Sequence, residues 1–243
     1  MGSMDTLRIA VLINTPPDNM EFWLDVRESW KSAFATISPT AQVDLYDPVI
    51  ERQFPDASKY NLIVLSGGKA DASSSEPWVL GVLNYVKSTA RDLPDTKIIG
   101  ICWGHQAVNR ALGGVVRAVP TGPIAAIEEI CLTEAGKTFF PFAVTTGTYK
   151  APEFHVREVA TPAPGFIHLA ENHECFVNEA NSILTFQGHP ELSKQLVKKM
   201  LLEEDKEYNG NLSPEQLEKE VRKLDQPMDG VKLLERVIQW VGE

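Results

Sequence analysis

The stretch that decides the fold is Lys97-Ile98-Ile99-Gly100-Ile101-Cys102-Trp103-Gly104-His105-Gln106. Its first five residues form an apolar run typical of a short buried strand, and apolar pairs recur at helical spacing after Gln106. Cys102 therefore lies at the bend between a strand and a helix, with a glycine two positions away on each side. Because glycine tolerates a backbone too tight for a residue with a Cβ, we expect a sharp elbow that lifts the Cys102 side chain out of the sheet.

The position of Cys102 favours a nucleophile, but a second interpretation is open. The partial positive charge at a helix N-terminus favours the thiolate form of a cysteine. A free cysteine is also commonly a small buried hydrophobic residue, and Gly-x-Cys-x-Gly is short enough to occur by chance. The presence of a base elsewhere in the chain would favour the nucleophile over the buried hydrophobic residue.

Composition narrows the class of protein. The chain has 243 residues, 43% of them hydrophobic, so it can bury a substantial core in one large or two small domains. The net charge of −10 and the lack of a basic cluster argue against nucleic acid and anionic membrane surfaces as partners. No apolar stretch approaches the ~20 residues of a membrane span, and the N-terminus lacks a signal-peptide pattern. The three cysteines show no C-x-x-C spacing, which fits a reduced, cytoplasmic compartment.

Strand and helix patterns alternate over residues 7–112, which predicts a parallel sheet with crossover helices. Strands are expected at 7–14, 43–46, 60–65 and 97–101, and helices at 21–37, at 77–89 and after Cys102. Shorter strand-like runs between proline and glycine turns follow at 115–118, 127–132, 142–146, 166–170 and 183–186. Helices return at 192–208, 214–224 and 230–241.

These patterns predict an α/β fold: an open, mostly parallel sheet with helices on both faces, a small antiparallel extension and C-terminal helices. Residues 1–6 are expected to be a tag remnant or a flexible N-terminus. Residues 7–243 are expected to form a single domain, with 200–243 as a helical C-terminal extension packed on it.

A candidate base stands in Gln187-Gly188-His189-Pro190-Glu191, which closes one predicted strand and opens a helix. The proline restricts the backbone and holds His189 and Glu191 on one tight turn. A histidine there can take the proton from a thiol, and a carboxylate two residues on can orient the imidazole and stabilise its cation. Together with Cys102 this gives the nucleophile, base and orienting acid that covalent acyl transfer requires.

The combination of Ser66-Gly67-Gly68, the Cys102 elbow and Gln187-Gly188-His189-Pro190-Glu191 resembles the class I (triad) glutamine amidotransferase domain in order and separation. The match covers roughly residues 7 to 200. The resemblance implies a flavodoxin-like fold, with Cys102 as nucleophile, His189 as base and Glu191 as its orienting acid. It further implies an oxyanion hole made by the backbone N–H groups of Gly68 and Trp103.

The resemblance also implies substrate contacts. Gln106 is expected to contact the bound glutamyl group, and Gly67 allows the backbone to approach it closely. Phe154 and His155 fall where amidotransferases keep a substrate-contact strand, although His155 is equally compatible with a structural role. Three features resemble the stand-alone members of the family, including γ-glutamyl peptidases: the stretch after Gly68, Pro77-Trp78, and Trp103. Residues 121–124 instead depart from the Gly-x-Glu-x-Gly pattern of that group.

We therefore expect a stand-alone cysteine hydrolase that cleaves γ-glutamyl amides or peptides through a thioester on Cys102, in glutathione-conjugate or biosynthetic processing. A glutaminase component that supplies ammonia to a separate synthase is the alternative, and a catalytically silent binding protein is the third. The chain shows no Walker loop or ATP-pyrophosphatase glycine signature, so a synthase partner is possible but not required.

No cofactor or metal is expected, because the five histidines lack i, i+3 or i, i+4 pairing. Cys131 and Cys175 are expected to be packing residues. His168 is expected to be a satisfied strand residue, and His173 an exposed turn residue.

Overall fold

A seven-stranded sheet forms the centre of the computed structural model, which describes residues 6–17, 19–204 and 212–243. The predicted tag remnant lies almost entirely outside the described residues. In spatial order the strands are β2 (Gln42–Tyr46), β1 (Arg8–Leu12), β3 (Leu62–Leu65), β4 (Lys97–Ile101), β11 (Ile183–Phe186), β10 (Cys175–Asn178) and β9 (Phe166–His168). The first five run parallel, and β10 is antiparallel to both of its neighbours.

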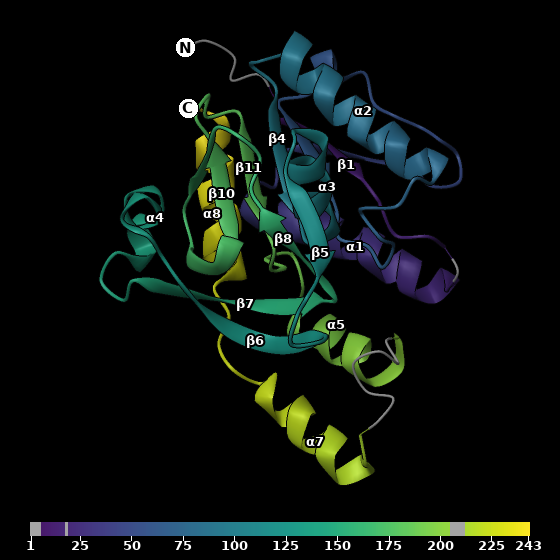
Figure 1. Ribbon diagram of the computed structural model, residues 1–243, viewed down its shortest axis with the longest axis vertical. Helices are drawn as coiled ribbons and strands as arrows, with labels where there is room; N and C mark the ends of the chain where they lie inside the picture. Colours follow the sequence, from purple (N-terminus) through teal and green to yellow (C-terminus); the bar gives the residue numbers. More distant parts are fainter. Residues whose placement is uncertain (1–5, 18, 205–211) are drawn as a thin grey trace.

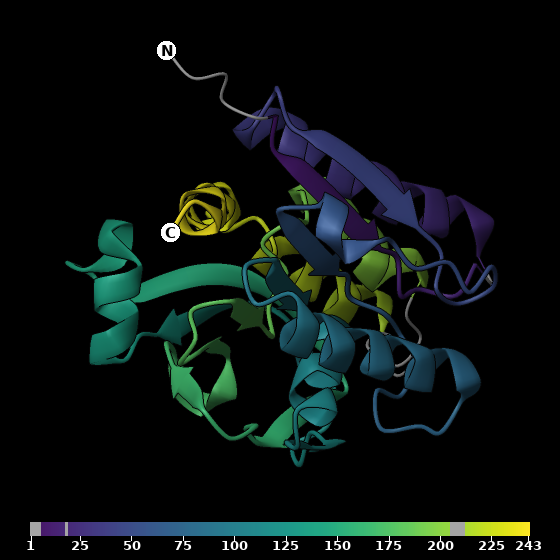
Figure 2. The same cartoon turned by 90° about the horizontal axis from the view of Figure 1, so that it is seen from above.

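Both faces of the sheet are covered, as its aliphatic strands require. Every residue of β3 and β4 is buried. Helices α1 (Met20–Ile37) and α8 (Gly230–Val241) pack on one face through Trp30, Phe34 and Trp240. Helices α2 (Pro77–Asp92) and α3 (Trp103–Ala111) pack on the other face (Figures 1 and 2). The predicted open sheet with helices on both faces is therefore confirmed.

The antiparallel extension consists of two antiparallel strand pairs beside the main sheet. Its strands are β5 (Val115–Ala118) with β8 (Arg157–Thr161), and β6 (Ile124–Cys131) with β7 (Thr148–His155). Strand β7 is nearly all buried, and the carbonyl of Phe154 near its end lies 3.6 Å from Cys102 Sγ, directly after the carboxyl end of β4. The short helix α4 (Glu134–Phe139) joins the two long strands (Figure 1).

The C-terminal third returns to helix. After the main sheet come α5 (Lys194–Lys199), the π-helical turn η4 (Met200–Glu204), α7 (Pro214–Lys223) and α8. Three short 3₁₀ turns complete the structure: η1 (Ala57–Lys59), η2 (Pro141–Ala143) and η3 (Glu171–His173). Helix α7 lies at the edge of the molecule below β6 (Figure 1). The last residues of the helix predicted over 192–208 lie outside the described residues.

Two local predictions are wrong. The strand expected at 142–146 is instead the 3₁₀ turn η2 followed by further turns, because Pro141 starts a helical turn and the chain then needs Gly147 at positive φ. Cys131 is exposed rather than packed, because alternate residues of β6 face solvent. Cys175 is buried, as expected.

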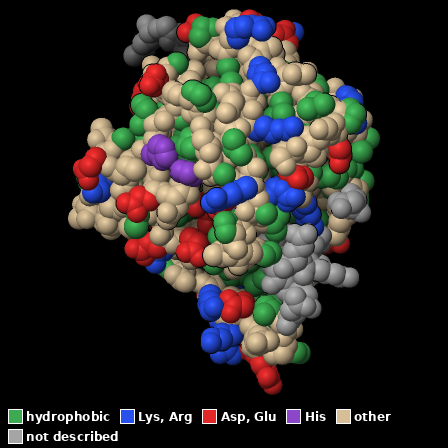
Figure 3. Space-filling view, in the orientation of Figure 1, with side chains coloured by type: hydrophobic (Ala, Val, Ile, Leu, Met, Phe, Trp, Pro, Cys, Tyr) green, Lys and Arg blue, Asp and Glu red, His purple; other side chains and the backbone are tan. Residues whose placement is uncertain are grey.

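Acidic and basic side chains are interspersed over the face shown in Figure 3. Among the residues that the structure describes, no helix combines the length and apolarity needed to cross a bilayer.

Candidate active site

The cysteine elbow (residues 100–104) joins β4 to α3 at the carboxyl edge of the sheet. Cys102 adopts φ 49° and ψ −103°, a left-handed conformation that is strained for a residue with a side chain. A Cβ on Gly100 would lie 2.6 Å from the carbonyl oxygen of Gly104, and one on Gly104 would lie 2.3 Å from that of Leu65. The two glycines are therefore required by packing, and they fix the sharp turn that presents the sulfur.

The histidine turn (residues 187–191) follows β11, the strand beside β4. His189 Nδ1 lies 2.9 Å from Glu191 Oε1, and both side chains are buried. The His189 N–H donates to the Pro152 carbonyl at 2.8 Å, and Ser29 Oγ on α1 donates to the Glu191 carbonyl at 2.8 Å. The turn is thus held from the extension on one side and from α1 on the other.

Electrostatics favour a protonated imidazole in the histidine turn. Burial by itself disfavours the imidazolium, but the negative charges of Cys102 and Glu191 outweigh it and raise the pKa of His189 well above its ordinary value. Nε2 of His189 has no hydrogen-bond partner among the described residues. That nitrogen is therefore available to exchange a proton with a neighbouring group.

Gly67 shows how close the cysteine and the histidine lie. A Cβ built on Gly67 would be 2.7 Å from His189 Cε1 and 3.5 Å from Cys102 Cβ. The two side chains therefore flank the same point, and only a residue without a side chain fits between them. The structure brings together the nucleophile, base and acid that the sequence predicts.

The two residues expected to supply the oxyanion donors, Gly68 and Trp103, lie next to each other. Trp103 is the first residue of α3, so its N–H has no acceptor within the helix. In the described part of the chain, the Gly68 N–H donates to no backbone carbonyl. A Cβ on Gly68 would be 3.6 Å from Trp103 Cγ, so the two residues are in contact range, and the Trp103 ring stacks on Trp78 at 5.0 Å between centroids.

The predicted substrate contacts fall into two groups. The backbone of Phe154 borders Cys102, because Cys102 Sγ lies 3.6 Å from the Phe154 carbonyl oxygen. Gln106 and His155 instead bond to the protein: Gln106 Nε2 donates to the Arg157 carbonyl at 2.7 Å, and His155 Nδ1 lies 2.8 Å from the same oxygen. Burial lowers the pKa of His155, which keeps its ring neutral. Gln106 Nε2 also donates to Gln187 Oε1 at 3.2 Å, so both side chains are engaged by the protein itself in this structure.

Of the remaining histidines, His173 is half-buried rather than exposed, with Nδ1 2.7 Å from the Val159 carbonyl oxygen, and His168 is exposed on β9. Among the residues described here, no three metal-ligating side chains come together.

The structure adds residues that the sequence pattern did not single out. Asp71 and Arg157 form an ion pair of 2.7 Å that joins the loop after Gly68 to β8. Arg110 donates to the carbonyls of Ala72 and Ser74 and anchors the same loop to α3. Charged residues are common in turns and on the surfaces of helices and strands, so only their partners reveal this role.

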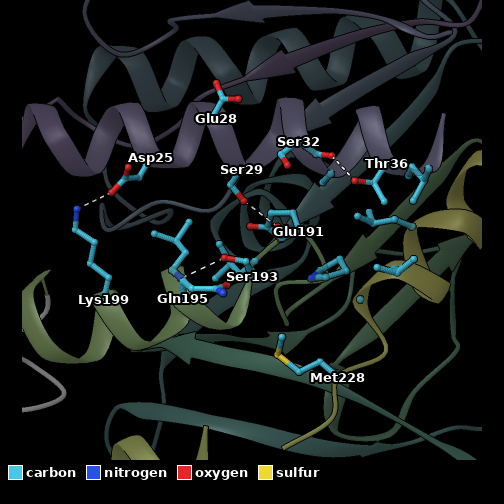
Figure 4. Close-up of a pocket in the computed structure, with 18 residues that line it drawn as sticks. Asp25, Glu28, Ser29, Ser32, Thr36, Glu191, Ser193, Gln195, Lys199 and Met228 are labelled. Carbon is cyan, nitrogen blue, oxygen red and sulfur yellow. Dashed lines mark hydrogen bonds and ion pairs between the residues drawn. The ribbon is translucent and has the colours of Figure 1, made fainter. Parts of the chain in front are cut away.

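A cavity of about 540 Å³ lies behind the histidine turn, between α1, α5 and α8. Figure 4 shows Ser29 reaching Glu191 at its wall and Lys199 paired with Asp25 at its rim. Neither Cys102 nor His189 is among its lining residues. The cavity therefore borders Glu191 rather than Cys102.

Comparison with known proteins agrees with this geometry. The family model described as glutamine amidotransferase class-I matches residues 24–206. The glutamine amidotransferase-like protein chyE of Penicillium rubens is 61% identical over 243 residues, covering 100% of both chains. Gamma-glutamyl peptidase 2 of Arabidopsis thaliana is 28% identical over 199 residues, which is 79% of each chain.

Solved structures show the same fold. The crystal structure of a glutamine amidotransferase from Thermotoga maritima superposes with a TM-score of 0.71 at 14% identity, covering 98% of this chain and 99% of that one. The structure of SMU.1228c gives a TM-score of 0.73 at 17% identity, covering 98% and 100%. With the family model matching most of its length, the chain belongs to the class I glutamine amidotransferase family.

Proposed function

We propose that this chain is a stand-alone cysteine hydrolase that cleaves γ-glutamyl amide or peptide bonds through a thioester on Cys102. The observation that carries the proposal is the convergence of Cys102 and His189 on the point beside Gly67, with Glu191 bonded to the far side of the imidazole. A nucleophile, a base and an acid that orients the base are the parts required for acyl transfer.

The first half of the reaction forms the thioester. The Cys102 thiolate attacks the γ-carbonyl carbon of the substrate, and the carbonyl oxygen becomes an oxyanion held by the N–H groups of Gly68 and Trp103. His189 then gives its proton to the departing amine as the C–N bond breaks. The raised pKa of His189 suits this step, because it keeps the imidazole protonated until the leaving group needs the proton.

The second half releases glutamate. Water attacks the thioester carbonyl while His189 accepts its proton, and the C–S bond breaks to restore the Cys102 thiolate and the imidazolium. Glu191 stabilises that cation at Nδ1 throughout. The net reaction consumes one water and uses only side chains and backbone groups of the chain, with no cofactor.

The relatives favour hydrolysis of γ-glutamyl compounds over delivery of ammonia to a synthase. Four relatives from Arabidopsis thaliana are named gamma-glutamyl peptidases, at 27–29% identity. The two side chains are also largely shielded from solvent, since Cys102 and His189 are only 5% and 4% exposed. A small γ-glutamyl tip attached to a larger leaving group fits such a site.

The test is an activity screen with the purified chain. Glutathione, a glutathione S-conjugate, γ-glutamyl dipeptides and glutamine are supplied separately, glutamate release is measured, and the thioester on Cys102 is trapped by acid quench and intact-mass spectrometry. Cys102→Ala is expected to abolish release, and Cys131→Ala, at an exposed cysteine on β6, is the matched control. Inertness toward every donor until a second protein is added would instead identify a glutaminase component.

A further inference from the structure

Glu153 is a buried carboxyl group with no donor to satisfy it. It lies on β7 directly before Phe154, whose carbonyl borders the sulfur of Cys102, and it is only 2% exposed. Neither of its oxygens receives a hydrogen bond from the described residues. A buried carboxylate without donors is strongly disfavoured, so the group must hold a proton or share one.

The neighbouring histidine favours the same conclusion, because burial lowers the pKa of His155 and keeps its ring neutral. His155 Nδ1 faces the Arg157 carbonyl at 2.8 Å, so this nitrogen must carry the hydrogen, because a carbonyl only accepts. In the neutral ring Nε2 is then a bare acceptor, and it lies 3.4 Å from Glu153 Oε2. Two acceptors facing each other repel, unless the carboxyl group of Glu153 is protonated.

The second carboxyl group is that of Glu174, at the start of β10. It faces Glu153 closely enough for the two carboxyl groups to hydrogen-bond, and its Oε2 is shielded from solvent without a donor of its own. Two carboxyl groups in contact cannot both ionise cheaply, so above about pH 7, where Glu174 has lost its own proton, they retain one proton between them. Glu153 is the donor of that proton, since it is the more deeply buried of the two.

Both acids are joined to the histidine turn. Oε1 of Glu153 lies 2.4 Å from the position that a Cβ on Gly188 would occupy, so the carboxyl group fills the space beside that residue. The Gln187 N–H donates to the Glu174 carbonyl at 2.8 Å, and the His189 N–H donates to the Pro152 carbonyl at 2.8 Å. The backbone on either side of Gly188 is thus held by the segments that carry the two acids.

We propose that Glu153 and Glu174 form a proton-sharing positioning pair that fixes the histidine turn, and with it the imidazole of His189, relative to Cys102. The pair deepens the function proposed above, since it acts on the same site. It touches neither the substrate nor the reacting atoms, and its effect passes through the backbone of residues 187–189.

The charges around Glu153 and Glu174 are consistent with a pair that keeps a shared proton. Burial raises the pKa of Glu153 well above its ordinary value and that of Glu174 to about 7. Six further titratable groups interact electrostatically with the pair: Cys102 at the elbow, Glu128 on β6, Tyr149 and His155 on β7, Glu158 on β8 and Cys175 on β10. Burial raises the pKa values of Tyr149 and Cys175 and so favours their neutral forms, whereas the carboxylates of Glu128 and Glu158 add negative charge that opposes loss of the shared proton.

The decisive variants are Glu153→Gln and Glu153→Leu. The amide of glutamine can donate to Glu174 as the protonated acid does, whereas leucine fills the space without donating. The readout is the rate of alkylation of Cys102 by iodoacetamide as a function of pH, followed by peptide mass spectrometry. This readout needs no γ-glutamyl substrate, so it separates failure of the pair from failure of the proposed function.

We expect Glu153→Gln to retain the alkylation profile of the wild type. In Glu153→Leu, alkylation at acidic pH should fall roughly 10²-fold, as for a misplacement of about 1 Å at a reactive group. Equal damage by Gln and Leu would mean that Glu153 acts as a carboxylate, which overturns the proposal. Wild-type behaviour of both variants would also overturn it, because the turn would then not depend on the pair.

Infrared difference spectra keep the proposal testable if Glu153→Leu does not fold. Titration of the wild-type protein from about pH 5 to about pH 9 should remove one protonated-carboxyl band that is absent from Glu174→Gln. A second such band, from Glu153, should persist across this range and be absent from Glu153→Gln. Absence of both bands in the wild type overturns the shared proton.

Discussion

His189 Nδ1 and Glu191 Oε1 lie 2.9 Å apart with a single residue, Pro190, between them in the chain. The proline limits the backbone conformations that could separate the two side chains. The proposed base and the acid proposed to orient it are therefore held together by one turn, and each can be tested through the other.

Replacing Glu191 by glutamine should leave a hydrogen-bond acceptor but remove the negative charge. We expect the pKa of His189 to fall in Glu191→Gln, as measured by NMR titration of its ring, since Glu191 is one of the two charges that raise it. The rate of γ-glutamyl hydrolysis should fall by roughly 10²- to 10⁴-fold, the usual range for loss of an effective general base. Glu51→Gln, at an exposed position, is the control. An unchanged His189 pKa would contradict the role given to Glu191.

Gly67→Ala tests the space between the cysteine and the histidine. The new Cβ would lie 2.7 Å from His189 Cε1, so the ring must shift. We expect kcat to fall roughly 10²-fold while the chain still folds, since one displaced ring suffices for a loss of that size. Gly242→Ala is the matched control, because its nearest neighbour is 3.4 Å away. Full activity in Gly67→Ala, checked beside the melting temperature, would show that the ring position is not critical.

The carboxyl group of Glu174 should make stability depend on pH. Its pKa is raised by burial from 4.5 to about 7, so the native state keeps a proton that the unfolded chain releases. The stabilisation is complete below about pH 4.5 and is lost as pH rises toward about pH 7. Glu153 acts with the same sign, because burial raises its pKa as well.

Glu174→Gln should therefore flatten the pH dependence of the free energy of unfolding. The difference from the wild type across this window should be on the order of 3 kcal/mol, since one pKa unit corresponds to about 1.4 kcal/mol. Urea unfolding at a series of pH values measures it, with the exposed Glu171→Gln as the neighbouring control. Parallel curves for Glu174→Gln and the wild type would rule out a titrating carboxyl group here.

The ion pair between Asp71 and Arg157 should affect substrate binding more than stability. It is partly exposed, with side chains 34% and 30% accessible, so its loss should cost no more than about 1 kcal/mol of unfolding free energy. It nonetheless ties the loop after Gly68 to β8, and Asp71→Asn should raise KM for the γ-glutamyl substrate with a smaller change in kcat. Asp92→Asn, which breaks an exposed pair of the same length at the end of α2, should leave KM unaltered.

The main sheet and the core of the site could be predicted because their signals are local. Continuous aliphatic strands such as β3 have few alternatives to a covered parallel sheet. The elbow at Cys102 and the histidine turn each carry their geometry in consecutive residues, through glycine in one and proline in the other. Their convergence followed from the family resemblance, since β4 and β11 are far apart in the sequence.

The extension was harder to predict, because its strands break the usual rules. Strand β7 contains Pro152 and charged residues, which normally argue against a buried strand. They are tolerated because Pro152 pairs with Ile127 of β6 while its carbonyl accepts from His189. The burial of Glu153 could not be predicted from the sequence, because a glutamate beside a proline is typical of a turn.

The two glycines of the elbow also carry a consequence for descent. Their fit against Leu65 and against each other does not involve the sulfur of Cys102. A gene copy in which Cys102 became alanine would, under the function proposed above, lose the reaction in one step, while the packing of the two glycines would stay as it is. The Gly-x-x-x-Gly spacing alone would then mark the bend in a descendant, and only the residue between the glycines would separate a descendant that keeps the proposed reaction from one that has lost it.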